Sequence, residues 1–396
     1  MGGRLVRRSW VWNPGIYAPS SFRRSCGYDA FIPDDLADLH LNLTGDVAGV
    51  VADAERAIVR LNRSAGPELA PLARLLLRSE SIASSKVEGM QVDARTLARA
   101  EANQDAGRRV GPESAEILAN IDAMQLAIAR ASTSDPITPA DILAIHAALM
   151  ARGSAANMAG RIRTTQNWIG GNDYNPCGAD FVPPPHDELV RLLDDLARFC
   201  NQENLPTLIQ AAVAHAQFET IHPFEDGNGR TGRAVVQIVL RRRGLAPSFV
   251  PPVSIVLARH RDRYIGGLDA FREDRIGDWL EMFAVATRQA TDLAAAYTQR
   301  VSELQDRWRE RLRHASNPRA DAAAWAVMDI LPAHPVITVP VGVAATRRTK
   351  PAVTNALAEL QAAGVLERLG ESTRNRGWEA EGLLDLIVAL EAGVGA

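Results

Sequence analysis

The twelve residues from His222 to Arg233, which read HPFEDGNGRTGR, constrain the fold of this 396-residue chain more than any other segment. The apolar residues of 205–220 predict a helix that delivers His222 to a loop, and a second helix is expected to begin near Arg230. The glycines on either side of Asn228 let successive backbone N–H groups turn toward one point, at a helix N-terminus whose dipole favours negative charge. The segment therefore predicts two helices joined by an anion-binding loop.

The polar side chains of this loop are suited to nucleotide chemistry. Arg230 and Arg233 are three residues apart on the first helical turn, so both guanidinium groups can face one bound anion. Asp226 places a carboxylate beside the phosphate site, which suits Mg²⁺, and His222 is the residue type that titrates nearest neutrality, which suits a general base. Taken singly, each residue also has a structural alternative, such as a tight turn or a solvated arginine. Together they predict a nucleotide-transfer site, with Phe224 as a buried anchor of the loop.

The segment resembles the Fic family motif, H-x-F-x-[D/E]-G-N-G-R-x-x-R, at every defined position. The resemblance implies a protein adenylyltransferase that moves AMP from ATP to a Ser, Thr or Tyr hydroxyl of a protein and releases pyrophosphate. It assigns the general base to His222, the Mg²⁺ ligand to Asp226, the α/β-phosphate contacts to Gly227, Asn228 and Gly229, and the β/γ-phosphate contacts to Arg230 and Arg233. The related Doc-type kinases carry Ala and Lys where this chain has Gly227 and Gly229, so AMP transfer is favoured over phosphoryl transfer.

Residues 161–185 differ from the helical sequence around them, with two strand-like runs around a Gly-Gly-Asn-Asp turn and a triple proline at the end. This pattern predicts a β-hairpin. By the family resemblance it is a flap over the active site, and Ile169, Gly170 and Gly171 position the target by pairing with its backbone. Trp168 is expected to pack the hairpin onto the core.

A second resemblance lies upstream, where residues 84–89 (SSKVEG) match the inhibitory motif [S/T]-x-x-x-E-[G/N] of self-restrained Fic proteins. On this interpretation Glu88 lies on a helix, pairs with Arg233 and takes the place of the γ-phosphate as its charge partner. Ser84 helps to hold the inhibitory helix or its glutamate. The alternative is that Glu88 is a solvated helix residue.

The whole pattern predicts a mainly α-helical protein: a Fic-type helical core with a β-hairpin flap, plus a C-terminal winged helix-turn-helix. Residues 1–35 are expected to form an irregular arm, and Asn317-Pro318 marks a boundary. The expected domains are 1–110 (arm and helical region with the inhibitory helix), 111–316 (catalytic core with the flap at 161–185) and 317–396 (winged helix-turn-helix).

The composition bears on nucleic-acid binding, on the state of the cysteines and on where in the cell the protein is expected. The formal net charge of −3 argues against a surface that coats nucleic acid. The three cysteines, Cys26, Cys177 and Cys200, are widely separated and odd in number, so reduced thiols are expected. The first residues lack the apolar run of a signal peptide, and no run reaches the ~20 residues of a membrane span. A cytoplasmic protein is expected.

The expected partners are ATP with Mg²⁺, an unidentified target protein and, by family analogy, a second copy of the chain in a homodimer; self-modification is a further alternative. DNA is weakly supported, because residues 319–380 hold seven Lys/Arg and six Asp/Glu, a net charge of +1. Two other functions stay open from the sequence. One is a DNA-binding transcriptional regulator whose Fic core senses nucleotide, and the other is a de-AMPylase in which Glu88 orients water.

Overall fold

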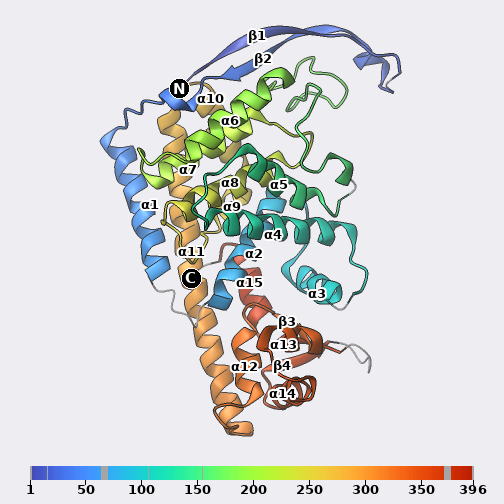
Figure 1. The fold of residues 1–396 in the computed structure, drawn as a ribbon, viewed down its shortest axis with the longest axis vertical. Coiled ribbons are helices and arrows are strands. Elements are labelled where there is room, and N and C mark those ends of the chain that lie inside the picture. The colour runs from blue at the N-terminus through green and yellow to red at the C-terminus, as the bar shows by residue number, and fades with distance from the viewer. Residues whose placement is uncertain are drawn as a thin grey trace.

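The computed structural model describes residues 2–15, 17–63, 70–105, 107–153, 155–369 and 376–394. The protein is mainly helical, as the sequence predicts, with two small antiparallel sheets. A hairpin of β1 (Gly3–Trp10) and β2 (Cys26–Pro33) arches over one end of the helical body (Figure 1). Among the described residues, no helix combines the length and apolar character that a membrane span requires.

The helical body surrounds one fully buried helix. Every residue of α7 from Leu208 to Ile221 is buried, because apolar residues predominate around the helix and it packs against α6, α8, α10 and α11. The helices of the body are α1 (Gly45–Arg63), α2 (Ala70–Val87), α3 (Ala94–Asp105), α4 (Pro112–Ala131), α5 (Pro139–Met150), α6 (Leu189–Cys200), α7 (Thr207–Ile221), α8 (Asn228–Arg242), α9 (Val253–Arg259), α10 (Arg261–Arg272) and α11 (Ile276–Ala315).

Helix α2 runs through the middle of the molecule. Its residues from Leu75 to Ser85 are all buried, and it contacts α4, α9 and α15. The helix ends at Val87, where Gly89 takes a φ of +89° and its N–H donates to the carbonyl of Lys86. Glu88 therefore lies in the turn just after the helix, rather than on it as predicted.

Helix α11 joins the two parts of the protein (Figure 1). Its 40 residues correspond to a length of about 60 Å. Trp279 and Phe283, near its start, lie in the hydrophobic core around α7, whereas Trp308 and Leu312, near its end, lie in a second core with the C-terminal elements. The second core also includes Leu75 and Leu76, so α2 contacts both parts.

The C-terminal part places helices around a three-stranded antiparallel sheet of order β3-β5-β4. Its elements are α12 (Ala323–Ile330), β3 (Val336–Thr338), α13 (Val339–Thr346), α14 (Lys350–Ala362), β4 (Leu366–Leu369), β5 (Gly377–Ala380) and α15 (Leu383–Glu391). Helix α15 returns from this sheet to pack on α2, α3 and α11.

Two predictions for the N-terminal region are wrong. The arm expected to be irregular contains two strands, because β1 and β2 pair in register from Gly3–Pro33 to Trp10–Cys26. The cysteines are not all reduced: Cys26 and Cys177 form a disulfide, while Cys200 is a buried free thiol. The reason is spatial, since β2 lies against the flap segment and brings together two residues that are 151 positions apart.

The flap at 161–185 is also less regular than predicted. Its only β pairing among the described residues is a single bridge, in which the Ile169 N–H donates to the Phe181 carbonyl at 2.8 Å. Gly170 and Gly171 follow with φ of +74° and +75°, which takes the chain out of the extended conformation at once. Trp168 packs against Trp10 of β1, with ring centroids 5.4 Å apart.

Candidate active site

The predicted loop lies between α7 and α8, and His222 is its first residue. His222 has left-handed backbone angles (φ 48°, ψ 59°), and its N–H closes the last turn of α7 by donating to the Phe218 carbonyl. A non-glycine residue in this conformation is uncommon and turns the chain sharply. Phe224 follows as a fully buried residue, which confirms its predicted role as an anchor.

Two buried polar side chains fix the shape of the loop. The side-chain amide of Asn228 spans it, accepting from the Phe224 N–H at 2.9 Å and donating to the Phe224 carbonyl at 2.8 Å. His146 of α5 stacks on the Phe224 ring, with centroids 3.7 Å apart. Its Nδ1 accepts the Gly160 N–H, so its Nε2 carries the proton and donates to the Asp226 carbonyl at 3.0 Å. Burial lowers the pKa of His146 to about 4, which keeps this ring neutral.

The carboxylate of Asp226 lies at the start of α8 and is accessible. Its Oδ1 accepts from the Gly227 N–H at 2.6 Å and lies 3.5 Å from Nη2 of Arg230, while 58% of the side chain is exposed. Arg230 itself is buried. A carboxylate, a guanidinium and the free N–H groups of a helix N-terminus thus face the same side of the loop, an arrangement that suits a metal–phosphate complex.

His222 is held in its neutral form. Burial, with smaller contributions from the guanidinium groups of Arg272 and Arg163, lowers the pKa of its imidazole to about 4, although a hydrogen bond with the Glu219 backbone and the charge of Glu88 act in the opposite direction. Because a neutral imidazole nitrogen can accept a proton, His222 is in the form that a general base needs at neutral pH.

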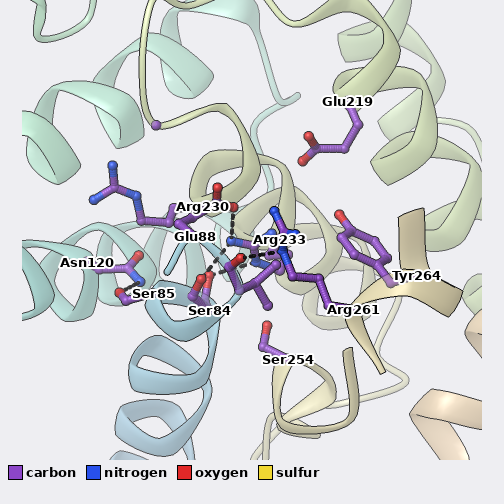
Figure 2. Close-up of polar contacts among 12 residues, drawn as sticks. Ser84, Ser85, Glu88, Asn120, Glu219, Arg230, Arg233, Ser254, Arg261 and Tyr264 are labelled. Atoms are coloured by element: carbon purple, nitrogen blue, oxygen red, sulfur yellow. Dashed lines mark hydrogen bonds and ion pairs between the residues drawn. The ribbon is translucent and has the colours of Figure 1, made fainter. Parts of the chain in front are cut away.

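Arg233 is bound by α2 and the turn that follows it (Figure 2). Its Nε donates to Oγ of Ser84 at 2.8 Å, and its Nη2 donates both to the Ser84 carbonyl at 2.8 Å and to Oε1 of Glu88 at 2.7 Å. Burial would raise the pKa of Glu88, but Arg233 outweighs it and holds that pKa below its ordinary value. The ion pair that the sequence predicts is therefore present.

Glu88 also lies directly over the start of α8. A Cβ atom built on Gly229 would be 2.0 Å from Oε1 of Glu88 and 2.9 Å from Nη1 of Arg233. A side chain at this position would therefore displace the carboxylate of Glu88 from its place beside Arg233. The space in front of Gly229, Arg230 and Arg233 is filled by a carboxylate of the protein itself.

The flap residues are placed in two groups. Its first residues contact the loop, because Asn167 Nδ2 donates to the Phe224 carbonyl at 3.0 Å and Thr165 donates to Glu225 at 2.7 Å. Ile169, Gly170 and Gly171 lie farther along, against the returning segment: a Cβ on Gly171 would be 2.8 Å from the Gly178 carbonyl.

Sequence reasoning missed several residues at the site. They are His146, Arg163, Glu219, Tyr264 and Arg272. Arg272 of α10 lies over the Phe181 ring of the flap, 3.8 Å from its centroid. Burial raises the pKa of Glu219, one turn before His222, to about 7. The signal that could have drawn attention to Glu219 is that it is the only acidic residue of helix α7, all of whose residues from Leu208 onward are buried.

Two family models match this chain. Residues 136–240 match the model described as Fic/DOC family, and residues 49–129 match that of the Fic/DOC family N-terminal region. These two segments cover the loop, the flap, α8 and the helices α2 to α4.

Relatives by sequence are protein adenylyltransferases. Protein adenylyltransferase Fic of Drosophila erecta is 31% identical over 160 residues, which are 40% of this chain and 29% of that protein. Protein adenylyltransferase fic-1 of Caenorhabditis elegans is 33% identical over 120 residues, 30% of this chain and 22% of that protein. The matched segments thus span less than a third of either relative.

The fold has a counterpart among solved structures. A Fic family protein from Desulfovibrio desulfuricans superposes with a TM-score of 0.52 at 21% identity, covering 86% of this chain and 98% of that one. The likeness extends beyond the two matched segments and shows a shared mainly helical fold.

Proposed function

The chain is a Fic/DOC family protein, and from that premise we propose that it transfers AMP from ATP to a hydroxyl group of a protein and restrains itself through Glu88. The observation that carries the proposal is the geometry of one short segment, in which a neutral His222, an exposed Asp226 carboxylate and the N-terminus of α8 with Arg230 and Arg233 lie together.

The residues divide the chemistry between them. His222 takes the proton of the target hydroxyl as its oxygen attacks the α-phosphorus, and pyrophosphate leaves with the electron pair of the broken P–O bond. Gly227, Asn228 and Gly229 bind the α/β-phosphates through their backbone N–H groups, because the side chain of Asn228 is already engaged by the loop. The Gly227 N–H, which donates to Oδ1 of Asp226 in this structure, has to exchange that carboxylate for a phosphate oxygen. Arg230 and Arg233 bind the β/γ-phosphates.

Asp226 is the residue that would hold Mg²⁺. Its exposed carboxylate fits a cation that uses one or two protein carboxylates together with substrate phosphates. Within the described residues no group of three His, Cys, Asp or Glu side chains forms a closed metal site, which agrees with a cation that arrives with ATP. When bound, Mg²⁺ would neutralise charge on the triphosphate, including the charge that develops on the departing pyrophosphate.

The two glycines of the loop favour AMP transfer over phosphoryl transfer. Gly227 has a φ of +77°, and a Cβ there would lie 3.0 Å from Leu149. Gly229 has no room for a side chain beside Glu88. The Ala and Lys of the related kinases would therefore strain this loop.

Restraint rests on the ion pair between Glu88 and Arg233. Arg233 is 2% exposed and uses its Nε and Nη2 groups on Ser84 and Glu88, so a γ-phosphate has to compete with Glu88 for it. Without that contact the triphosphate binds with its α-phosphorus out of line for attack. Ser84 holds the same guanidinium through two acceptors and keeps it aimed at Glu88.

Two further assignments complete the proposal. The flap, with Ile169, Gly170 and Gly171, positions an extended target segment. Residues 317–396 form a winged helix-turn-helix, supported by the order α12, β3, α13, α14, β4, β5 and the sheet order β3-β5-β4. A homodimer is proposed on the family resemblance alone.

The test compares the wild type with Glu88→Gly and Glu88→Gly/His222→Ala. Each protein is incubated with Mg²⁺ and with ATP that is labelled at the α- or the γ-phosphate. Self-modification is the first readout, and a cell extract then supplies target proteins. We expect protein-bound label only from α-labelled ATP, strong in Glu88→Gly, weak in the wild type and absent without His222. Label from the γ-position would mean a kinase, and no label in any protein would contradict AMP transfer.

A further inference from the structure

One buried arginine outside the motif connects the flap to the catalytic loop. Arg163 lies near the start of the flap (161–185) and is only 2% exposed. Its Nε donates to the His222 carbonyl at 2.9 Å, its Nη1 to the Thr165 carbonyl at 2.8 Å and its Nη2 to the Pro184 carbonyl at 2.5 Å. Its backbone N–H donates to the Pro223 carbonyl at 3.0 Å. Thus one residue joins the peptide that follows His222 to both ends of the flap.

The way in which Arg163 is buried is unusual for a cation. All three side-chain acceptors are neutral backbone carbonyls, and no described carboxylate lies within ion-pair distance of its guanidinium. Burial lowers the pKa of Arg163 to about 10, against opposing effects of Glu225 and Tyr28, so the group is still charged at neutral pH. Burying a charge without an ion pair is costly, and here the cost is offset mainly by hydrogen bonds to the three carbonyls that the guanidinium holds in place.

These carbonyls belong to the two parts that have to meet in catalysis. His222 has left-handed backbone angles, so its carbonyl direction, and with it the direction of the imidazole, depends on what holds that peptide. Thr165 and Pro184 are the points where the flap leaves and rejoins the body. A planar guanidinium with three N–H groups in fixed directions sets the relative position of all three, whereas a lysine ammonium has neither the span nor the planarity.

We propose that Arg163 is a positioning residue that fixes the position of the flap relative to His222. A target hydroxyl that the flap holds then lies within reach of the His222 imidazole and in line for attack on the α-phosphorus. This inference rests on the proposed AMP transfer. The side chain of Arg163 donates only to backbone carbonyls, those of His222, Thr165 and Pro184, so on this proposal it acts through the His222 peptide and the two ends of the flap. Loss of this positioning should therefore lower the rate of transfer and leave ATP binding intact, because the phosphates are held by α8.

The experiment uses the full-length Glu88→Gly protein as background and adds Arg163→Lys, Arg163→Met or Arg163→Ala. The matched control is Arg161→Met, because Arg161 is an exposed arginine two residues away in the same segment. Self-modification with α-labelled ATP gives kcat and KM for ATP, and calorimetry gives ATP affinity. We expect kcat to fall about 100-fold in Arg163→Met and nearly as far in Arg163→Lys, with KM and ATP affinity within about twofold of the background protein. Millimolar guanidinium should restore part of the rate to Arg163→Ala.

Hydrogen exchange supplies a readout that does not depend on activity. Amides of 165–184 and 222–228 should exchange faster in the Arg163 variants than in the Arg161→Met control, while those of α7 and α8 stay protected. Exchange rates equal to those of the Arg161→Met control, or ATP affinity that falls together with kcat, would overturn the proposal. If Arg163→Met does not fold, the same measurements on Arg163→Lys decide between the outcomes. If the Glu88→Gly protein itself transfers no AMP, the proposed function fails; unchanged exchange in the Arg163 variants would refute the positioning role separately.

Discussion

At the scale of single residues, Glu80 shows how a buried acid can make folding depend on pH. It lies in α2 at 1% exposure, and its two oxygens accept from the N–H and the hydroxyl of Ser254 at 2.9 and 2.6 Å. Burial raises the pKa of Glu80 from 4.5 to about 7, although Ser254 and Arg233 act in the opposite direction. The folded protein therefore holds a proton that the unfolded chain releases at lower pH.

The free energy of unfolding should fall as the pH rises from about 4.5 to about 7, by roughly 3 kcal/mol from this residue, and stay level above that range. Glu80→Gln keeps an acceptor and a donor for Ser254 but cannot ionise, so this part of the pH dependence should vanish. Urea unfolding at pH 5 and pH 8 measures it. Glu219 also has a raised pKa, but because it is present in both proteins, its contribution to the pH dependence cancels when the wild type is compared with Glu80→Gln.

The exposed Glu113 on the first turn of α4 provides the control, since Glu113→Gln should keep the wild-type difference between the two pH values. Equal pH dependence in the wild type and in Glu80→Gln would show that Glu80 is ionised in the folded protein throughout this range.

The sequence predicted the residues whose roles follow from local spacing. Asp226, Arg230 and Arg233 lie within two turns of one another, so their neighbourhood is set by the helix itself, and Glu88 was found through a short pattern. Arg163 and His146 could not be found this way. Their partners are backbone carbonyls of distant segments, and a backbone carbonyl leaves no trace in the identity of the residue that carries it.

At the scale of elements, the C-terminal end of α2 is held from three directions. Arg233 of α8 binds Ser84, Arg261 of α10 donates to the Val87 carbonyl at 3.2 Å, and Lys86 pairs with Glu391 of α15 at 2.6 Å. Figure 2 shows Arg261 and Arg233 on the same side of this helix end. The contact with α15 ties the turn that carries Glu88 to the C-terminal part of the chain.

Lys86→Met should weaken this tie. Burial raises the pKa of Glu391, whose side chain is 6% exposed, and without Lys86 its carboxylate has lost its ion-pair partner. We expect a loss of about 1–3 kcal/mol in the free energy of unfolding and a severalfold rise in AMP transfer, still below that of Glu88→Gly. Urea unfolding and α-labelled ATP measure the two effects.

The double variant Lys86→Met/Glu391→Gln distinguishes the effect of an unpaired Glu391 carboxylate from the effect of losing the contact between α15 and the end of α2. It should recover part of the stability, because no unpaired carboxylate is left, and it should keep the raised activity. A loss of stability in Lys86→Met with no change in AMP transfer would mean that the α15 contact does not affect the inhibitory turn.

Element boundaries were predictable where the chain itself supplies the stop signal. Thr138 and Asp141 form a capping box at the start of α5, and Gly244, with a φ of +71°, follows the last residue of α8 by two positions. The N-terminal hairpin was missed because its residues read as a polar arm until the flap supplies the surface that β2 covers. The flap was predicted as strands, yet its glycines limit the pairing to one bridge.

At the scale of the whole molecule, the N-terminal hairpin supports the flap from the side away from the helical body. Phe22 stacks on Tyr174 with ring centroids 5.4 Å apart, and Asn175 donates to the Phe22 carbonyl at 2.7 Å. The Phe31 N–H donates to the Val182 carbonyl at 2.9 Å. The Cys26–Cys177 disulfide joins the two segments covalently. The first part of the chain is therefore joined to the flap, in the middle of the chain, by ring stacking, backbone hydrogen bonds and a disulfide.

Because that disulfide closes a loop of 151 residues, it should limit local opening of the hairpin more than it affects the helical core. We expect reduction to speed tryptic cleavage after Arg23 and Arg24 about tenfold, while the far-ultraviolet circular dichroism stays unchanged. Cys26→Ser and Cys177→Ser should be cleaved as fast as the reduced wild type even without reductant, and Cys200→Ser should be cleaved as slowly as the oxidised wild type.

Alkylation of the unfolded, unreduced protein tests whether the disulfide forms, and it should label Cys200 alone. Labelling of all three cysteines would show that the bond does not form. Equal cleavage rates in the oxidised and the reduced protein would show that the aromatic contacts hold the hairpin by themselves.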